Sequence, residues 1–161
     1  MHSKKGGKEV GKMLMPTRIL VPTDFSEPSD RALKQALDIA RQYHAKVFLL
    51  HVIHEETQHP VAFDFGLDEE ILRQMNVHIR EEAKKRLQDQ LEKFPQAKEV
   101  EATADIRKGV TYEEILKEEK SKEIDLIVIA SLGRTGIAKY LIGSVARNVL
   151  RGAKCPVLLT K

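Results

Sequence analysis

Small and hydroxyl-bearing residues follow an apolar run near the end of the chain, and their spacing is suited to holding a phosphate group. The apolar run is LIVIA at 126–130, followed by SLGRTG at 131–136. Gly143-Ser144 comes later, with nine residues between Gly133 and Gly143. Small side chains let backbone N–H groups approach an anion, and the unpaired N–H groups and dipole of a helix N-terminus favour its negative charge. The segment therefore predicts a phosphate-binding turn between a strand and a helix.

The elements that must position this turn are short apolar runs alternating with helical periodicity. A turn at 23–26 follows the first run, with Ser26 a plausible N-cap, and from 68 to 94 apolar residues recur every three or four positions. The segments that connect successive apolar runs are long enough to cross over the sheet, so the strands are expected to pair in parallel. We expect strands at 18–22, 46–53, 99–107, 126–130 and 156–160, and helices at about 26–43, 68–94, 110–120 and 144–152.

This order predicts an α/β fold: a single-domain, doubly wound, five-stranded parallel sheet of order 3-2-1-4-5, Rossmann-like. Such sheets bind ligands beyond the carboxyl ends of the strands, where the strand order reverses. The reversal falls between the first and fourth strands, which end near Asp24 and Ala130. The two segments should therefore converge on one crevice.

Composition describes an ordinary globular domain with a basic extension. Of 27 basic and 24 acidic side chains, four lysines and one glutamate lie in residues 1–15, which leaves 23 of each sign in residues 16–161. We expect a flexible basic tail at 1–15, native or added, and one domain at 16–161. The neutral remainder gives no reason to expect nucleic-acid binding.

Nothing in the sequence indicates a membrane segment or a secretory signal, because no apolar run approaches the ~18 residues that a bilayer requires. Cys155 stands alone, which excludes an internal disulfide and fits a reducing compartment. It is expected to be a packing residue. We therefore expect a cytoplasmic protein.

The chain resembles a universal stress protein of the nucleotide-binding type from Thr17 to Lys161. The resemblance rests on VPTDFS at 21–26, LLHVI at 49–53, and residues 129–159. The family's ATP-binding pattern is Gly, two residues, Gly, nine residues, then Gly with Ser or Thr. Here the second and third glycines are Gly133 and Gly143, followed by Ser144, while Ala130 stands at the first.

The resemblance implies a bound ATP or AMP, with Mg²⁺ or Mn²⁺ possible beside the phosphates. It implies that Asp24 accepts hydrogen bonds from the ribose hydroxyls and that Pro22, Thr23, Val52 and Val110 wall the adenine pocket. It also implies a set of residues around the phosphates: Ala130, Ser131, Gly133, Arg134, Gly143, Ser144 and Val145.

Each residue also has a plain structural alternative. Asp24 suits an Asx turn, Ser144 a helix N-cap, Val52 and Val110 a core, and Arg134 a solvated loop. The histidines at 51, 54 and 59 lack acidic or sulfur partners at a supporting spacing, so no metal ligands are expected.

Motifs for group transfer are absent from the sequence. It contains neither Gly-x4-Gly-Lys-Ser/Thr nor Gly-x-Gly-x2-Gly, and neither the Ser-Gly-Gly-x-Asp-Ser nor the His-x-Gly-His element of related nucleotide enzymes. The favoured function is a non-catalytic sensor or regulator with an unidentified protein partner, and no catalytic residue is expected. A slow metal-dependent ATPase and an interaction protein that binds no nucleotide are the alternatives.

The last strand, 157–160, would lie at a sheet edge, and an apolar edge needs a cover. The resemblance implies that two copies pair these edges antiparallel in a homodimer.

Overall fold

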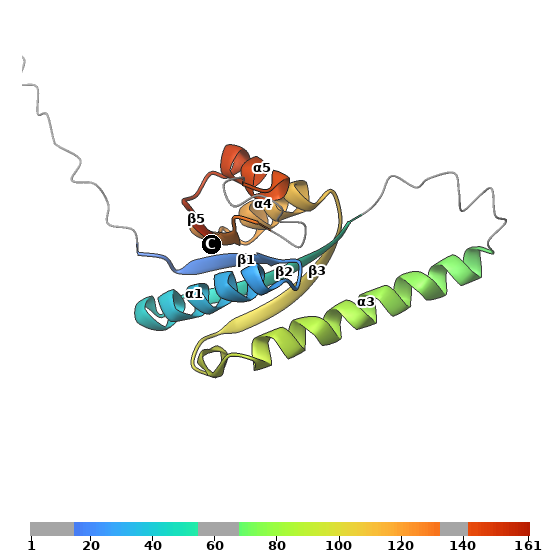
Figure 1. Cartoon of the computed structure of the whole chain (residues 1–161), viewed down its shortest axis with the longest axis horizontal. Helices are drawn as coiled ribbons and strands as arrows, with labels where there is room; N and C mark the ends of the chain where they lie inside the picture. The colour runs from blue at the N-terminus through green and yellow to red at the C-terminus, as the bar shows by residue number, and fades with distance from the viewer. Residues whose placement is uncertain (1–14, 55–67, 133–141) are drawn as a thin grey trace, which may run out of the picture.

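The computed structural model describes residues 15–54, 68–132 and 142–161, and within them the predicted fold class is confirmed (Figure 1). All strand pairs are parallel, and their order is β3-β2-β1-β4-β5. The strands are β1 (Arg18–Thr23), β2 (Lys46–His54), β3 (Ala102–Gly109), β4 (Leu126–Ala130) and β5 (Val157–Thr160). The helices are α1 (Glu27–Tyr43), α3 (Glu69–Glu92), α4 (Thr111–Ser121) and α5 (Ser144–Gly152), with a 3₁₀ turn, η1 (Pro95–Lys98).

Helices cover both faces of the sheet, α1 and α3 on one and α4 and α5 on the other (Figure 1). Alternate strand residues supply each core because successive side chains point to opposite faces. In β1, Ile19 and Val21 face α1, whereas Leu20 faces α4 and α5, and all three are fully buried. Thr23 lies two residues after Val21, so its side chain points to the same face of the sheet, toward α1 and α3.

The third strand begins later than expected, at Ala102 rather than at 99. Pro95 has a fixed φ that suits the first position of a helical turn, and it opens η1. Glu99 is the C-cap of η1, with its N–H bonded to Gln96 O, so it is not available to start the strand. The strand continues to Gly109, whose φ of 150° disfavours other residues. A Cβ there would lie 3.0 Å from Glu114 Oε1, so α4 packs tightly on the strand end.

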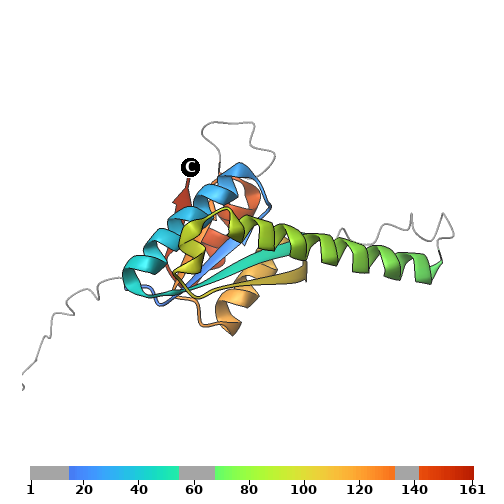
Figure 2. The same ribbon diagram turned by 90° about the horizontal axis from the view of Figure 1, so that it is seen from below.

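Helix α3 forms at its predicted position, but only its C-terminal half packs on the sheet. Its 24 residues span about 36 Å, whereas the eight residues of β3 span about 26 Å. Figures 1 and 2 both show the N-terminal half reaching past the sheet. Ala83 and Leu87 are buried, while Met75 and Ile79 on the same stripe are exposed.

Cys155 is a half-buried, inert thiol. Burial, with the Glu119 carboxylate beside it, raises the pKa of the Cys155 thiol to about 12. Glu119 also accepts hydrogen bonds from the backbone N–H groups of Lys154 and Cys155, at 2.6 and 2.8 Å. At neutral pH the sulfur is therefore protonated, which agrees with a packing role rather than a nucleophile.

None of the helices in the described part of the chain has the length and apolar character to span a membrane.

Candidate functional site

A cavity of about 350 Å³ opens at the carboxyl ends of β1, β2 and β4. Strands β1 and β2 stay paired as far as Thr23 and His51, whereas the pairs between β1 and β4 end at Leu20. Pro22 has no N–H to extend a ladder. The sheet therefore parts at the point where the strand order reverses, and this is where ligands bind in such folds.

Nine of the twelve residues proposed from the sequence line this cavity. They come from β1 and its turn, from β2, from the end of β4 and from the start of α5: Pro22, Thr23, Asp24, Val52, Ala130, Ser131, Gly143, Ser144 and Val145. Segments far apart in the chain thus meet at one place, as the strand order requires.

The other three residues fall elsewhere. Val110 is 40% exposed, stands at the N-cap of α4 and is not part of the cavity wall, where its neighbour Thr111 lies instead. Gly133 and Arg134 lie outside the described residues.

Sequence reasoning missed part of the wall. Thr111 is the first residue of α4 and lines the cavity. Its polar side chain, two residues after Gly109, is the feature from which the sequence could have indicated a place in the wall. No site role is predicted from the sequence for His51 or His54, and both line the cavity. Leu50, Ile115 and Ile129 look like core residues in the sequence, and all three are buried as well as lining the cavity floor.

The turn after β1 holds Asp24 by short-range hydrogen bonds. Asp24 Oδ1 accepts the backbone N–H of Ser26 at 3.0 Å and also its hydroxyl, which is the predicted Asx turn. Phe25 N–H donates to Thr23 Oγ1 at 3.0 Å. Phe25 has a φ of 64°, a left-handed conformation that costs a bulky residue about 1 kcal/mol. Several contacts must therefore maintain this turn.

Two aromatic contacts and a carbonyl contact surround the turn. The His51 ring lies 4.3 Å from the Phe25 ring, centre to centre, and His51 Nδ1 lies 2.9 Å from the Thr23 carbonyl oxygen. A carbonyl can only accept, so Nδ1 carries the proton. On α3, the Arg86 guanidinium lies 4.1 Å from the centre of the Phe25 ring.

On the opposite wall, backbone hydrogen bonds join the end of β4 to β5 and to the start of α5. Ser131 N–H donates to Thr160 O at 2.8 Å, and Gly143 N–H donates to Ser131 O at 2.8 Å. Gly143 is the N-cap of α5 and makes no side-chain capping bond, so Ser144 is the first helical residue and not the cap. The N-terminal amides of a nine-residue helix therefore border the cavity, and its N-cap residue has no side chain that could accept from them.

Ala130 takes an ordinary strand conformation. It ends β4, pairs with Thr160, and is not among the described residues with positive φ. Its backbone therefore needs none of the freedom of glycine, and its methyl group is the only difference from the family's glycine at this position.

The described wall of the cavity carries Asp24 and two histidines but no lysine or arginine. The described residues contain no group of three or more His, Cys, Asp or Glu arranged for a metal ion. Within the described wall, the positive end of α5 is the feature that suits a phosphate, and a cation carried with the ligand could add to it.

Comparison with known proteins extends these observations. The model of the Universal stress protein family matches residues 15–161. The chain is 32% identical over 146 residues to universal stress protein MJ0531 of Methanocaldococcus jannaschii, covering 89% of this chain and 81% of that protein. It is also 32% identical over 157 residues to MJ0577 of the same organism, covering 92% and 96%.

Solved structures agree with the fold. The structure of MJ0577 superposes with a TM-score of 0.77 at 32% identity, covering 91% of this chain and 96% of that one. A universal stress protein from Archaeoglobus fulgidus, solved in complex with dAMP, superposes with a TM-score of 0.58 at 22% identity, covering 91% and 99%. The second likeness supports the fold alone. By its sequence match and its architecture, this chain belongs to the universal stress protein family.

Proposed function

We propose that the cavity binds an adenine nucleotide, ATP or AMP, and that the protein acts as a nucleotide-responsive regulator. The observation that carries this proposal is the meeting of a carboxylate, Asp24, and the N-terminus of α5, whose N-cap is a glycine, at opposite walls of one crevice. A ribose diol and a phosphate are the groups that these two features would recognise.

The assignment of parts follows the chemistry of the wall. Pro22 and the buried Val52 offer apolar surface to the base, and Thr111 takes the place expected for Val110. At the other end, Ser144 offers its hydroxyl and its backbone N–H to the phosphates. Ala130, Ser131, Gly143 and Val145 line this end too. Gly133 and Arg134 keep the phosphate role that the family pattern implies.

Binding is favoured over catalysis. Transfer of a phosphoryl group requires a positioned nucleophile and charge stabilisation, and the described wall offers only Asp24 and the two histidines for such work. Mg²⁺ or Mn²⁺ would be held chiefly by the phosphates themselves, since the described residues supply no metal cluster. The alternative is a slow ATPase, and accumulation of ADP in a single-turnover assay that Asp24→Asn abolishes would establish it.

Calorimetry of wild-type protein with ATP, AMP and adenosine tests the binding proposal. We expect heat with all three, and we expect Ser144→Ala to weaken ATP about tenfold while leaving adenosine unchanged, because only the phosphate end loses a donor. Ser121→Ala is the matched control, since that hydroxyl donates to Glu118 O at 3.3 Å on α4 and is not part of the cavity wall. Absence of heat with every ligand would favour an interaction protein that binds no nucleotide.

We further propose a homodimer through β5. This strand is last in the sheet order, so within the described part of the chain its outer edge has no neighbouring strand. Its apolar residues Val157, Leu158 and Leu159 are half-buried, and antiparallel pairing of two such edges would cover them. Light scattering at micromolar concentration should give twice the chain mass of 18.3 kDa. Leu158→Pro should shift this mass toward one chain, and a monomeric mass for the wild type would contradict the proposal.

A further inference from the structure

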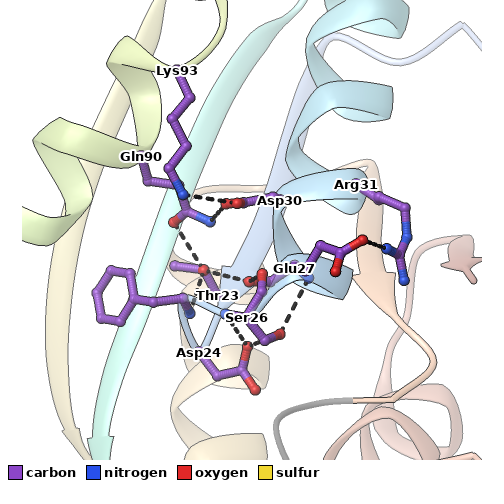
Figure 3. A network of polar contacts seen from close by, with 10 residues as sticks. Thr23, Asp24, Ser26, Glu27, Asp30, Arg31, Gln90 and Lys93 are labelled. Carbon is purple, nitrogen blue, oxygen red and sulfur yellow. Dashed lines mark hydrogen bonds and ion pairs between the residues drawn. The ribbon is translucent and has the colours of Figure 1, made fainter.

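A fully buried polar side chain joins helix α3 to the turn that carries Asp24. Gln90 is 2% exposed and lies on the packed face of α3, three residues after Leu87. Figure 3 shows it reaching from α3 between Thr23, at the end of β1, and Asp30, in the first turn of α1. Gln90 Oε1 lies 2.9 Å from Thr23 Oγ1, and Gln90 Nε2 lies 2.7 Å from Asp30 Oδ1.

Only one orientation of the amide satisfies both neighbours. The Asp30 carboxylate can only accept, so it must face the amide nitrogen of Gln90, and the amide oxygen then receives the single proton of the Thr23 hydroxyl. Thr23 Oγ1 also lies 3.0 Å from Ser29 Oγ, and it accepts the N–H of Phe25 at 3.0 Å. Through the Thr23 hydroxyl, the amide of Gln90 on α3 is thus connected to the backbone of the turn.

Two further contacts tie α3 to the same place. Lys93, one helical turn after Gln90, donates to Asp30 Oδ2 at 2.8 Å. Arg86, one turn before, stacks on the ring of Phe25, whose left-handed backbone needs support. Residues on three successive turns of α3 thus hold both sides of Asp24, which itself contacts the cavity.

We propose that α3 holds the Asp24 turn of the nucleotide site in place and that Gln90 is a positioning residue for Asp24. The hydrogen bonds from Gln90 set the Thr23–Ser26 turn, and the turn sets the carboxylate. Any event that shifts α3 would then change the affinity of the site. The part of this inference that concerns affinity rests on the proposed nucleotide binding, while the part that concerns the turn does not.

The first test uses protein without ligand. Gln90→Leu removes both hydrogen bonds at similar volume, and Gln88→Leu makes the same change at an exposed position of α3 whose amide donates only to Glu92. Amide hydrogen exchange at Phe25 and Ser26 should become about tenfold faster in Gln90→Leu, with exchange at Val128 in β4 unchanged. Unchanged exchange at Phe25 and Ser26, or an equal rise at Val128, would overturn the positioning role.

The second test measures ATP affinity in a double-mutant cycle. Gln90→Leu should weaken ATP binding about tenfold in the wild-type background but less than about twofold when Asp24 is already alanine, because Gln90 acts through Asp24. Gln88→Leu should bind ATP like the wild type. Independent, additive effects of Gln90→Leu and Asp24→Ala would overturn the inference. If wild-type protein binds no ATP, the proposed function fails, and the exchange experiment alone decides the role of Gln90.

Discussion

Replacing Asp24 by alanine is expected to weaken ATP binding about a hundredfold. A carboxylate that accepts two ribose hydroxyls makes two charge-assisted hydrogen bonds, each contributing about 1.5 kcal/mol or more, and about 3 kcal/mol corresponds to a hundredfold change in Kd. Asp24 also accepts the N–H and hydroxyl of Ser26, so the variant loses part of the local turn as well. Calorimetry on the folded variant, verified by circular dichroism, measures the loss.

The control for this prediction lies in the ligand. ATP that lacks the 2′ and 3′ hydroxyls should bind wild-type protein about as weakly as ATP binds Asp24→Ala, and removing the hydroxyls should cost nothing further in the variant. The ATP affinity of Asp24→Asn should fall between those of the wild type and Asp24→Ala, because asparagine keeps one acceptor oxygen for Ser26 but loses the charge. Equal ATP affinity for wild type and Asp24→Ala would show that the carboxylate is only a turn residue.

The largest expected effect on stability comes from Arg107. The side chain of its partner, Glu118, is 2% exposed, and the carboxylate accepts Arg107 Nε at 2.9 Å as well as Nη2. The hydrogen bond that Arg107 donates to Glu118 raises the pKa of the guanidinium, so Arg107 keeps its positive charge. The two residues join edge strand β3 to α4, which forms part of the cavity wall.

Arg107→Met should lower the free energy of unfolding by about 2–3 kcal/mol, because a buried carboxylate is left without its counter-charge. The value is below the range for a fully buried pair because the Arg107 side chain is 37% exposed and partly screened by water. Urea denaturation at pH 7 measures it as a lower midpoint with an unchanged slope.

The double variant Arg107→Met with Glu118→Met provides the control. It should recover most of the stability lost in the single variant, because two apolar side chains leave no charge to desolvate. Arg107→Lys should lose less stability than Arg107→Met, since lysine keeps the positive charge but lacks the bidentate donors of the guanidinium. A double variant as unstable as the single one would show that packing, rather than the unpaired carboxylate, dominates the effect.

The fold could be predicted because its signals are local. The apolar runs, the N-cap at Ser26 and the step of three to four residues across 68–94 each depend on near neighbours in the chain. The strand order 3-2-1-4-5 was an expectation for a doubly wound sheet, because parallel connections also allow the order 2-1-3-4-5. The structure confirms the order and shifts only boundaries, such as the start of β3 after Pro95. The length of α3 was predicted as well, but the sequence did not reveal that its first half lies beyond the sheet.

The contents of the cavity wall were predicted only in part. Asp24, Ser131 and Ser144 carry recognisable chemistry next to strand ends, and the structure brings them to one cavity. Thr111 lies where Val110 was expected, because the rotation of the first turn of α4, a tertiary feature, decides which residue faces inward. Gln90 is a polar residue on the apolar stripe of α3, which indicates a buried polar contact. Its partners Thr23 and Asp30 lie 67 and 60 residues away in the chain, so the sequence did not identify them.

The sequence by itself determined the elements and the phosphate-binding candidate at 131–144, because hydrophobic periodicity, turn chemistry and the small residues at strand ends act over a few residues. Only the tertiary structure decided that β1 and β4 part beyond Leu20 to open the cavity, and that the turn at Asp24 is held from α3. Both facts depend on which buried groups meet across the fold. A buried amide must find its donor and acceptor wherever packing places them, and no pattern of neighbouring residues specifies that place.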